Sequence, residues 1–93
     1  MFTKQELSLF QSNYFSNFSY TNHTIEVQSI NTGHWWRISK KDMPRSTMIQ
    51  TLHKYNRSNK YHKQCYVHTT SKACNLIKSH DDYILLSDII KCL

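Results

Sequence analysis

The sequence predicts one small α+β domain, in which an antiparallel sheet of about four strands is flanked by an N-terminal and a C-terminal helix. Three observations lead to this fold class. The chain has 93 residues, 39% of them hydrophobic, which suffices for one core but not for a second independent domain. A helix-start motif stands near the N-terminus, and strand-like segments separated by turn residues fill the middle. We therefore expect residues 1–93 to fold as a single domain.

The first helix is predicted from a capping box at its start. In Thr3-Lys4-Gln5-Glu6, the Thr3 side chain can cap the helix while Glu6 reaches back to the Thr3 amide, so the helix should begin at Lys4. Apolar residues follow at spacings of three and four: Leu7, Phe10, Tyr14 and Phe18. They form one apolar stripe that needs a surface to cover, and the sheet is the natural candidate.

The strands are predicted from alternation and turn residues. Residues 24–39 predict a β-hairpin whose turn contains Gly33, where the backbone needs a positive φ. Residues 48–53 and 61–68 are two further strand candidates. The polar segment 54–60 between them is expected to be an exposed connection.

The second helix is expected to start at Thr70 or Ser71 and to run to about His80. Its common apolar face would consist of Ala73, Leu76 and Ile77. Residues 83–90 fit either a buried strand or turn leading into a short terminal helix, and their pattern does not distinguish these alternatives.

Charge and cysteine content limit the classes of partner and the cellular setting that we expect. Twelve Lys and Arg residues against six Asp and Glu give a formal charge of +6, which favours binding to polyanions, although solubility alone can account for such a charge. The three cysteines are widely spaced and lack a C-x-x-C pair, as expected for a reducing, cytoplasmic setting. No apolar run has the length of a secretion signal or a membrane span, so we expect no membrane association.

An open face of the sheet is the first candidate binding surface. If both helices cover one face, strand alternation places Trp36 with the core and Trp35 with Arg37 on the opposite face. In the strand at 61–68, Cys65 and Val67 are the better core candidates. The open face would then carry Trp35, Arg37, His62, Tyr66 and His68. Such aromatic and cationic side chains suit nucleic acid or a protein interface. Two alternatives stay open. The residues assigned to the core and to the open face could be exchanged, or Trp35 and Tyr66 could form only a cross-strand pair.

The densest basic and aromatic run is the second candidate. It comprises Lys54, Tyr55, Arg57, Lys60, Tyr61 and Lys63. A loop of this kind can follow a phosphate backbone and release counterions, which would make its affinity depend on salt. A solvated charge run is the alternative interpretation. Lys40, Lys41 and Arg45 form a weaker basic patch near the hairpin.

Metal binding and catalysis are not predicted. His62-x-x-Cys65-x-x-His68, with His53 nearby in sequence, has ligand-type residues, but on a regular strand His62 and His68 face away from Cys65. The six carboxylates show no paired acid and base, and the chain has no glycine-rich phosphate loop. We therefore expect no metal ligands, no catalytic residues and no cofactor, and a zinc-dependent enzyme is the least favoured class.

Several segments resemble a known group of proteins. Residues 32–38, 53–54, 61–63 and 80–86 are similar to short uncharacterised proteins of low-GC Gram-positive bacteria, their phages and other mobile elements. This resemblance implies a mobile-element context rather than an activity. Small single-domain proteins of that context without catalytic motifs often resemble inhibitors of host defence, such as anti-CRISPR proteins, which block a host nucleoprotein effector. The helix–sheet–helix order also resembles the double-stranded-RNA-binding domain, but only Lys72 and Lys78 stand at the start of the last helix. Direct binding of DNA or RNA is thus the alternative function.

Overall fold

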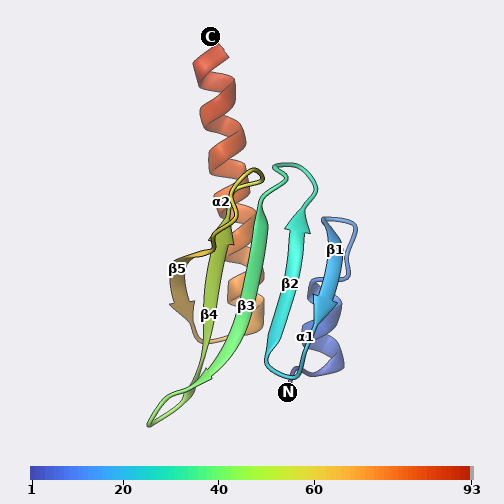
Figure 1. Ribbon diagram of the computed structural model, residues 1–93, viewed down its shortest axis with the longest axis vertical. Helices are drawn as coiled ribbons and strands as arrows, with labels where there is room; N and C mark the ends of the chain where they lie inside the picture. Colours follow the sequence, from blue (N-terminus) through green and yellow to red (C-terminus); the bar gives the residue numbers. More distant parts are fainter. Residues whose placement is uncertain (93) are drawn as a thin grey trace.

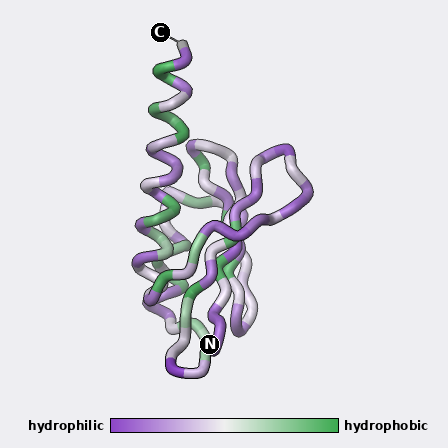
Figure 2. Tube along the Cα trace, turned by 90° about the vertical axis from the view of Figure 1, so that its left-hand side faces the viewer, coloured by the Kyte–Doolittle hydropathy of each residue, from purple (hydrophilic) through white to green (hydrophobic). Residues whose placement is uncertain are grey.

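The computed structural model describes residues 1–92, which form an α+β fold with a single five-stranded sheet and two helices (Figure 1). The elements in chain order are α1 (Lys4–Leu9), β1 (Phe15–Tyr20), β2 (Thr24–Ser29), β3 (Trp35–Asp42), β4 (Thr47–Lys54), β5 (His62–Val67) and α2 (Thr70–Cys92). Both helices lie on the same face of the sheet, and the other face is open (Figures 1 and 2). The predicted α+β class is confirmed, with one strand more than expected.

The sheet is an antiparallel meander in the order β1-β2-β3-β4-β5. The predicted hairpin at 24–39 is confirmed as the β2–β3 pair, in which Val27 lies opposite Trp36. Gly33 adopts φ +75° in its turn, as its position predicted. The β3–β4 pair continues the alignment and places Trp36 opposite His53.

Helix α1 begins as predicted but is shorter. The Thr3 hydroxyl accepts from the Glu6 N–H, and the Glu6 carboxylate accepts from the Thr3 N–H, which completes the capping box. The helix ends at Leu9, so its expected continuation to Phe18 is wrong. A turn at 11–14 redirects the chain into β1, which is the unexpected fifth strand. Phe10 and Phe15 still pack in the same core, with ring centroids 5.5 Å apart.

Helix α2 is one continuous helix through residues 83–90, so a strand there is wrong. Thr69, one residue before the expected cap, accepts the Lys72 N–H through its hydroxyl. The half of α2 after Asp81 projects past the sheet (Figures 1 and 2). Its more than half-exposed apolar side chains are Tyr83, Leu86, Ile89 and Ile90. Neither helix within residues 1–92 is long and apolar enough to cross a membrane.

The core lies between the sheet and the two helices. Its fully buried apolar side chains are Phe10, Ile25, Val27, Trp36, Ile38, Ala73 and Ile77. Burying one large side chain of this kind contributes about 1.5–3 kcal/mol. Trp36 is fully buried, whereas its neighbour Trp35 is only partly buried on the opposite face. The predicted division of the two tryptophans between the faces is therefore confirmed.

Candidate functional site

The open face of the sheet is the larger of two candidate sites. Strand pairing places Trp35 opposite Lys54 on β3 and β4, and Leu52 opposite Lys63 on β4 and β5. Because alternate residues share a face, the helix-free surface carries these chemically active side chains: Glu26, Trp35, Arg37, Lys54, Lys63 and Tyr66. We call this set the open face.

Tyr61 leaves the β4–β5 connection and lies across the open face. Its hydroxyl donates to Glu26 Oε2 at 3.0 Å, and Arg37 Nη2 lies 3.0 Å from the same oxygen. The Arg37 guanidinium stacks 4.3 Å from the centroid of the Tyr61 ring. Burial, with the hydrogen bond to Glu26, raises the pKa of Tyr61. The phenol therefore stays protonated and holds Arg37 in place.

Lys54 is held over two aromatic rings of the same face. Its Nζ lies 5.2 Å from the centroid of Trp35 and 5.2 Å from that of Tyr61. Each such contact contributes about 0.5–1 kcal/mol at an exposed site. The cation is thus oriented above the strands although it remains accessible to solvent.

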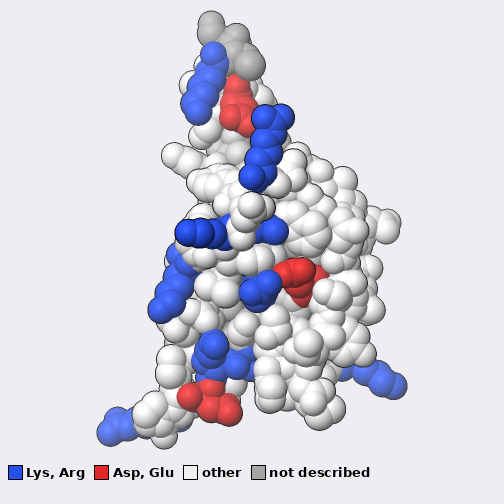
Figure 3. All heavy atoms as spheres, in the orientation of Figure 1, with Lys and Arg blue, Asp and Glu red and all other residues white. Residues whose placement is uncertain are grey.

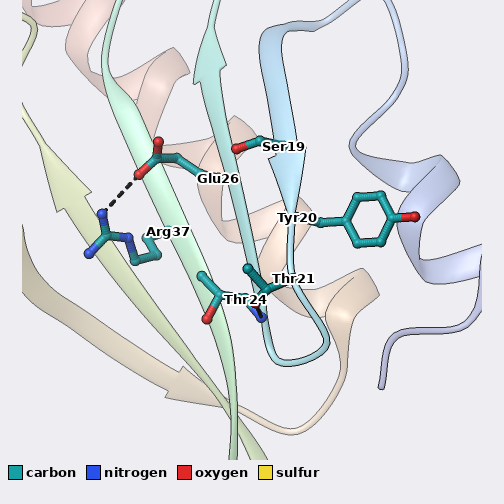
Figure 4. A pocket seen from close by; sticks show the side chains of 6 residues that line it. All are labelled: Ser19, Tyr20, Thr21, Thr24, Glu26 and Arg37. Atoms are coloured by element: carbon teal, nitrogen blue, oxygen red, sulfur yellow. Dashed lines mark hydrogen bonds and ion pairs between the residues drawn. The ribbon is translucent and has the colours of Figure 1, made fainter.

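A shallow hollow of about 280 Å³ extends the open face toward β1. Its lining consists of Ser19, Tyr20, Thr21, Thr24, Glu26 and Arg37. Figure 4 shows the Arg37–Glu26 ion pair at one side of this hollow, while the Tyr20 ring is turned away from it. The hollow is wide open to solvent, so it extends the binding surface rather than enclosing a small molecule.

Positive charge gathers on the β3–β5 side of the open face. Figure 3 looks onto this face and shows Lys and Arg side chains along that side, with few carboxylates among them. Within residues 1–92, the ion pairs involve only Arg37 and Lys40 among the cations. Lys63 and the loop residues Arg57 and Lys60 are exposed and face solvent without a carboxylate partner in that part of the chain. These charges are available to a polyanion.

The predicted partner-binding residues do not all share this face. Trp35, Arg37, Lys54, Lys63 and Tyr66 do. Arg57 and Lys60 lie in the 55–61 loop, and His68 lies beyond the end of β5, where it is exposed.

The placement of His62 on the open face is wrong. An irregularity in β5 pairs Leu52 with Lys63 but Thr51 with Cys65, so one extra residue stands between them. This bulge reverses the alternation, and His62 faces the helix side opposite His53. Tyr55 lies there as well, with its ring centroid 4.8 Å from that of His53. The basic run is therefore divided between the two faces of the sheet.

A histidine cluster on the helix side is the second candidate site. It consists of His34 before β3, His53 on β4 and His80 on α2, with His62 beside them. One ring nitrogen from each of the first three lies within 4.8 Å of the others. His53 Nε2 lies 2.9 Å from His34 Nδ1, and His53 Nδ1 lies 3.2 Å from His62 Nε2. We call His34, His53 and His80 the histidine triad.

The triad is surrounded by apolar and aromatic groups. His34 and His53 are buried, and the Trp36 ring packs against both His53 and His80. Burial, together with repulsion from the neighbouring imidazoles, lowers the pKa of His53 to about 3. Burial also lowers the pKa of His34. These two rings are therefore neutral near pH 7.

A buried carboxylate supports the triad from the side. Asp81 is fully buried and accepts hydrogen bonds from the Tyr14 hydroxyl at 2.6 Å and the Thr32 hydroxyl at 3.0 Å. The Thr32 hydroxyl also accepts the His34 N–H. Thr32 thus joins the β2–β3 connection, which carries His34, to the turn of α2 that carries His80. Burial, with the hydrogen bond to Asp81, raises the pKa of Tyr14.

The triad could not be found from spacing along the chain, because its members stand 19 and 27 residues apart. Strand register could have indicated only the edge of the cluster, since a β4–β5 hairpin places His53 opposite His62, which lies beside the triad. Glu26 was likewise not singled out, and its partner Tyr61 was noted only as part of the basic run. No protein-family model, curated protein or solved structure matches the chain.

Proposed function

We propose that this chain is a non-enzymatic binding protein that docks its open face on a nucleoprotein, such as a CRISPR–Cas effector of a bacterial host, and blocks a functional surface. One observation carries this proposal. The open face is a helix-free sheet surface on which cations surround partly exposed aromatic side chains. Aromatic and Arg anchors with a basic rim suit an interface with an acidic partner.

The arrangement of the rings favours a nucleoprotein over a free single strand. Base stacking needs an uncovered aromatic face. On the open face, Lys54 lies over Trp35, and Lys54 and Arg37 lie over Tyr61. These rings already act as supports that orient cations, so they present charge at fixed positions. Cations held in this way lose less conformational freedom on binding, which favours a rigid, folded partner.

Direct binding of DNA or RNA is the second candidate, and the loop supports it. Arg57, Lys60 and Lys63 are exposed in or next to the β4–β5 connection. Such a row can contact successive phosphates without reading bases. The resemblance to proteins of phages and mobile elements is compatible with both candidates.

Affinity capture from the bacterial host, with and without nuclease treatment, tests the proposal. We expect a protein effector to be retained after nuclease treatment. Direct nucleic-acid binding instead predicts a mobility shift with naked DNA or RNA that weakens steeply between 50 and 200 mM salt, by roughly 10-fold or more. A nuclease-sensitive capture combined with such a shift would replace the first candidate by the second.

Matched charge reversals then test the surface. Lys63→Glu should weaken binding to the captured partner by about 10-fold, whereas Lys72→Glu, which makes the same charge change at an exposed position of α2, should not. Trp35→Ala should also weaken binding while the circular dichroism spectrum stays native. Unchanged affinity in folded Trp35→Ala and Lys63→Glu variants would remove the open face from consideration.

A further inference from the structure

We propose that His34, His53 and His80 bind one divalent transition-metal ion, with Zn²⁺ as the ion of choice. The site lies on the helix side of the sheet and is separate from the open face. Imidazole nitrogens are ligands that suit Zn²⁺, Cu²⁺ and Ni²⁺. The inference is independent of the binding function proposed above.

The three side chains already converge on one point. One nitrogen from each ring lies within 4.8 Å of the other two, and His34 Nδ1 and His53 Nε2 are 2.9 Å apart. A tetrahedral zinc ion with Zn–N bonds of about 2.0–2.1 Å needs nitrogens roughly 3.4 Å apart. The His34–His53 separation is shorter than that value, and the separations to His80 are at most 4.8 Å. Small side-chain rotations that set the three separations near the tetrahedral value would complete the site.

An unused lone pair also points to a cation. His80 Nε2 is buried and has no hydrogen-bond partner among residues 1–92. Burying a polar nitrogen without a partner is unfavourable. Apolar side chains of similar size would pack against Trp36 without that cost, yet two histidines occupy these positions. With its proton on Nδ1, His80 would offer the Nε2 lone pair to a metal ion, and the ion would also replace the hydrogen bond between His34 and His53.

The surrounding groups have the character of outer-shell partners. A metal-bound histidine usually donates its other ring N–H to an acceptor, which fixes the ring. With Nε2 of His53 on the metal, its Nδ1–H can donate to His62 Nε2, which is 3.2 Å away. The Thr32–Asp81 hydrogen bond holds the segments that carry His34 and His80 together. His62 is thus assigned as a positioning residue, not a ligand.

The site would join three elements that are distant in sequence. His34 precedes β3, His53 belongs to β4 and His80 belongs to α2, so one ion would fasten the helix to the sheet. Three protein nitrogens leave one position of a tetrahedral ion for water. Binding to the folded state alone would raise the melting temperature, and the rise would grow with the logarithm of the free ion concentration above the Kd.

The test uses the 93-residue chain without a histidine tag, stripped with a chelator and titrated with Zn²⁺. We expect one equivalent to bind and to raise the melting temperature. His80→Gln should weaken Zn²⁺ binding by roughly 10-fold or more, because it removes a ligand. His62→Gln should have a smaller effect. His68→Gln, at an exposed histidine away from the triad, serves as the control and should bind as the wild type does.

A second measurement keeps the proposal testable if His80→Gln fails to fold. In ¹⁵N-labelled wild-type protein, Zn²⁺ should shift the ring nitrogens of His34, His53 and His80 and leave those of His23 and His68 in place. Absence of stoichiometric binding by the folded wild type would overturn the site. So would zinc-induced shifts confined to the exposed His23 and His68, or unchanged affinity in a folded His80→Gln variant.

Discussion

Replacing Glu6 with Gln should reduce stability at neutral pH and have little effect in acid. The Glu6 carboxylate accepts from Thr70 Oγ1, from the Thr3 N–H and from Lys40 Nζ, and so joins α1 to α2 and β3. Partial burial opposes its ionisation, but these interactions outweigh burial and lower its pKa from 4.5 to about 2. A lowering of this size corresponds to at most about 3 kcal/mol. Solvent screening of the partly exposed pair reduces the expected contribution to about 1–2 kcal/mol.

The sign of the pH dependence follows from the lowered pKa. The charged Glu6 stabilises the fold fully above pH 4.5, and this contribution is lost as the pH falls from 4.5 toward 2. Urea unfolding between pH 7 and pH 3 gives the free energy of unfolding of the wild type and of Glu6→Gln at each pH. The difference between the two proteins is the contribution of the Glu6 charge, because the titration of other groups cancels in it. Asp82→Asn, at an exposed carboxylate, is the control and should cost less than about 0.5 kcal/mol. A stability difference that stays constant with pH would refute the role of the charge.

Two further changes probe the core and the hairpin, each measured by urea unfolding. Tyr14→Phe removes the hydroxyl that donates to buried Asp81 at 2.6 Å, and it should lower the free energy of unfolding by about 1.5–3 kcal/mol. The control Tyr20→Phe, at an exposed ring, should change it by less than about 0.5 kcal/mol. Equal costs would contradict a stabilising role for the Tyr14–Asp81 hydrogen bond. Gly33→Ala forces a side chain onto φ +75° and brings its Cβ 3.0 Å from Asn56 Nδ2, so it should cost about 1–2 kcal/mol. In an Asn56→Ala background, Gly33→Ala should cost less, because the clash between its Cβ and the Asn56 side chain is absent. If Gly33→Ala then had no cost at all, the positive φ would not contribute to the loss of stability.

Local signals predicted the elements whose structure is decided locally. The capping box at Thr3 and Glu6 and the turn at Gly33 each depend on a few neighbouring residues, and both are confirmed. Where apolar spacing alone was used to extend the first helix beyond Leu9, the prediction was wrong. Phe18 continues the helical spacing of α1, yet it lies in β1, where Asn17 at φ 54° accompanies an irregular register with β2. Tertiary pairing with β2 therefore overrides the helical pattern.

The candidate sites were predictable only as far as regular alternation holds. Trp35 and Arg37 were placed correctly because β3 is regular in its pairing with both neighbours. His62 was placed on the wrong face because the bulge before Cys65 shifts the alternation by one residue, and nothing in the local sequence marks it. The triad depends on where α2 lies against the sheet, which brings His80 to His53. That packing is a property of the whole chain and cannot be read from a segment.

The meander has a consequence for the order in which this protein folds. Each strand from β2 to β5 pairs with the strand that precedes it, so the sheet can form from successive hairpins as the chain is synthesised. The contacts that span most of the chain, such as Glu6 with Thr70 and Tyr14 with Asp81, all require α2. Residues 15–67 leave the ribosome before α2, which packs against β4 and β5. The nascent sheet therefore presents part of its apolar face to solvent, and to chaperones, until residues 70–81 have been added and docked.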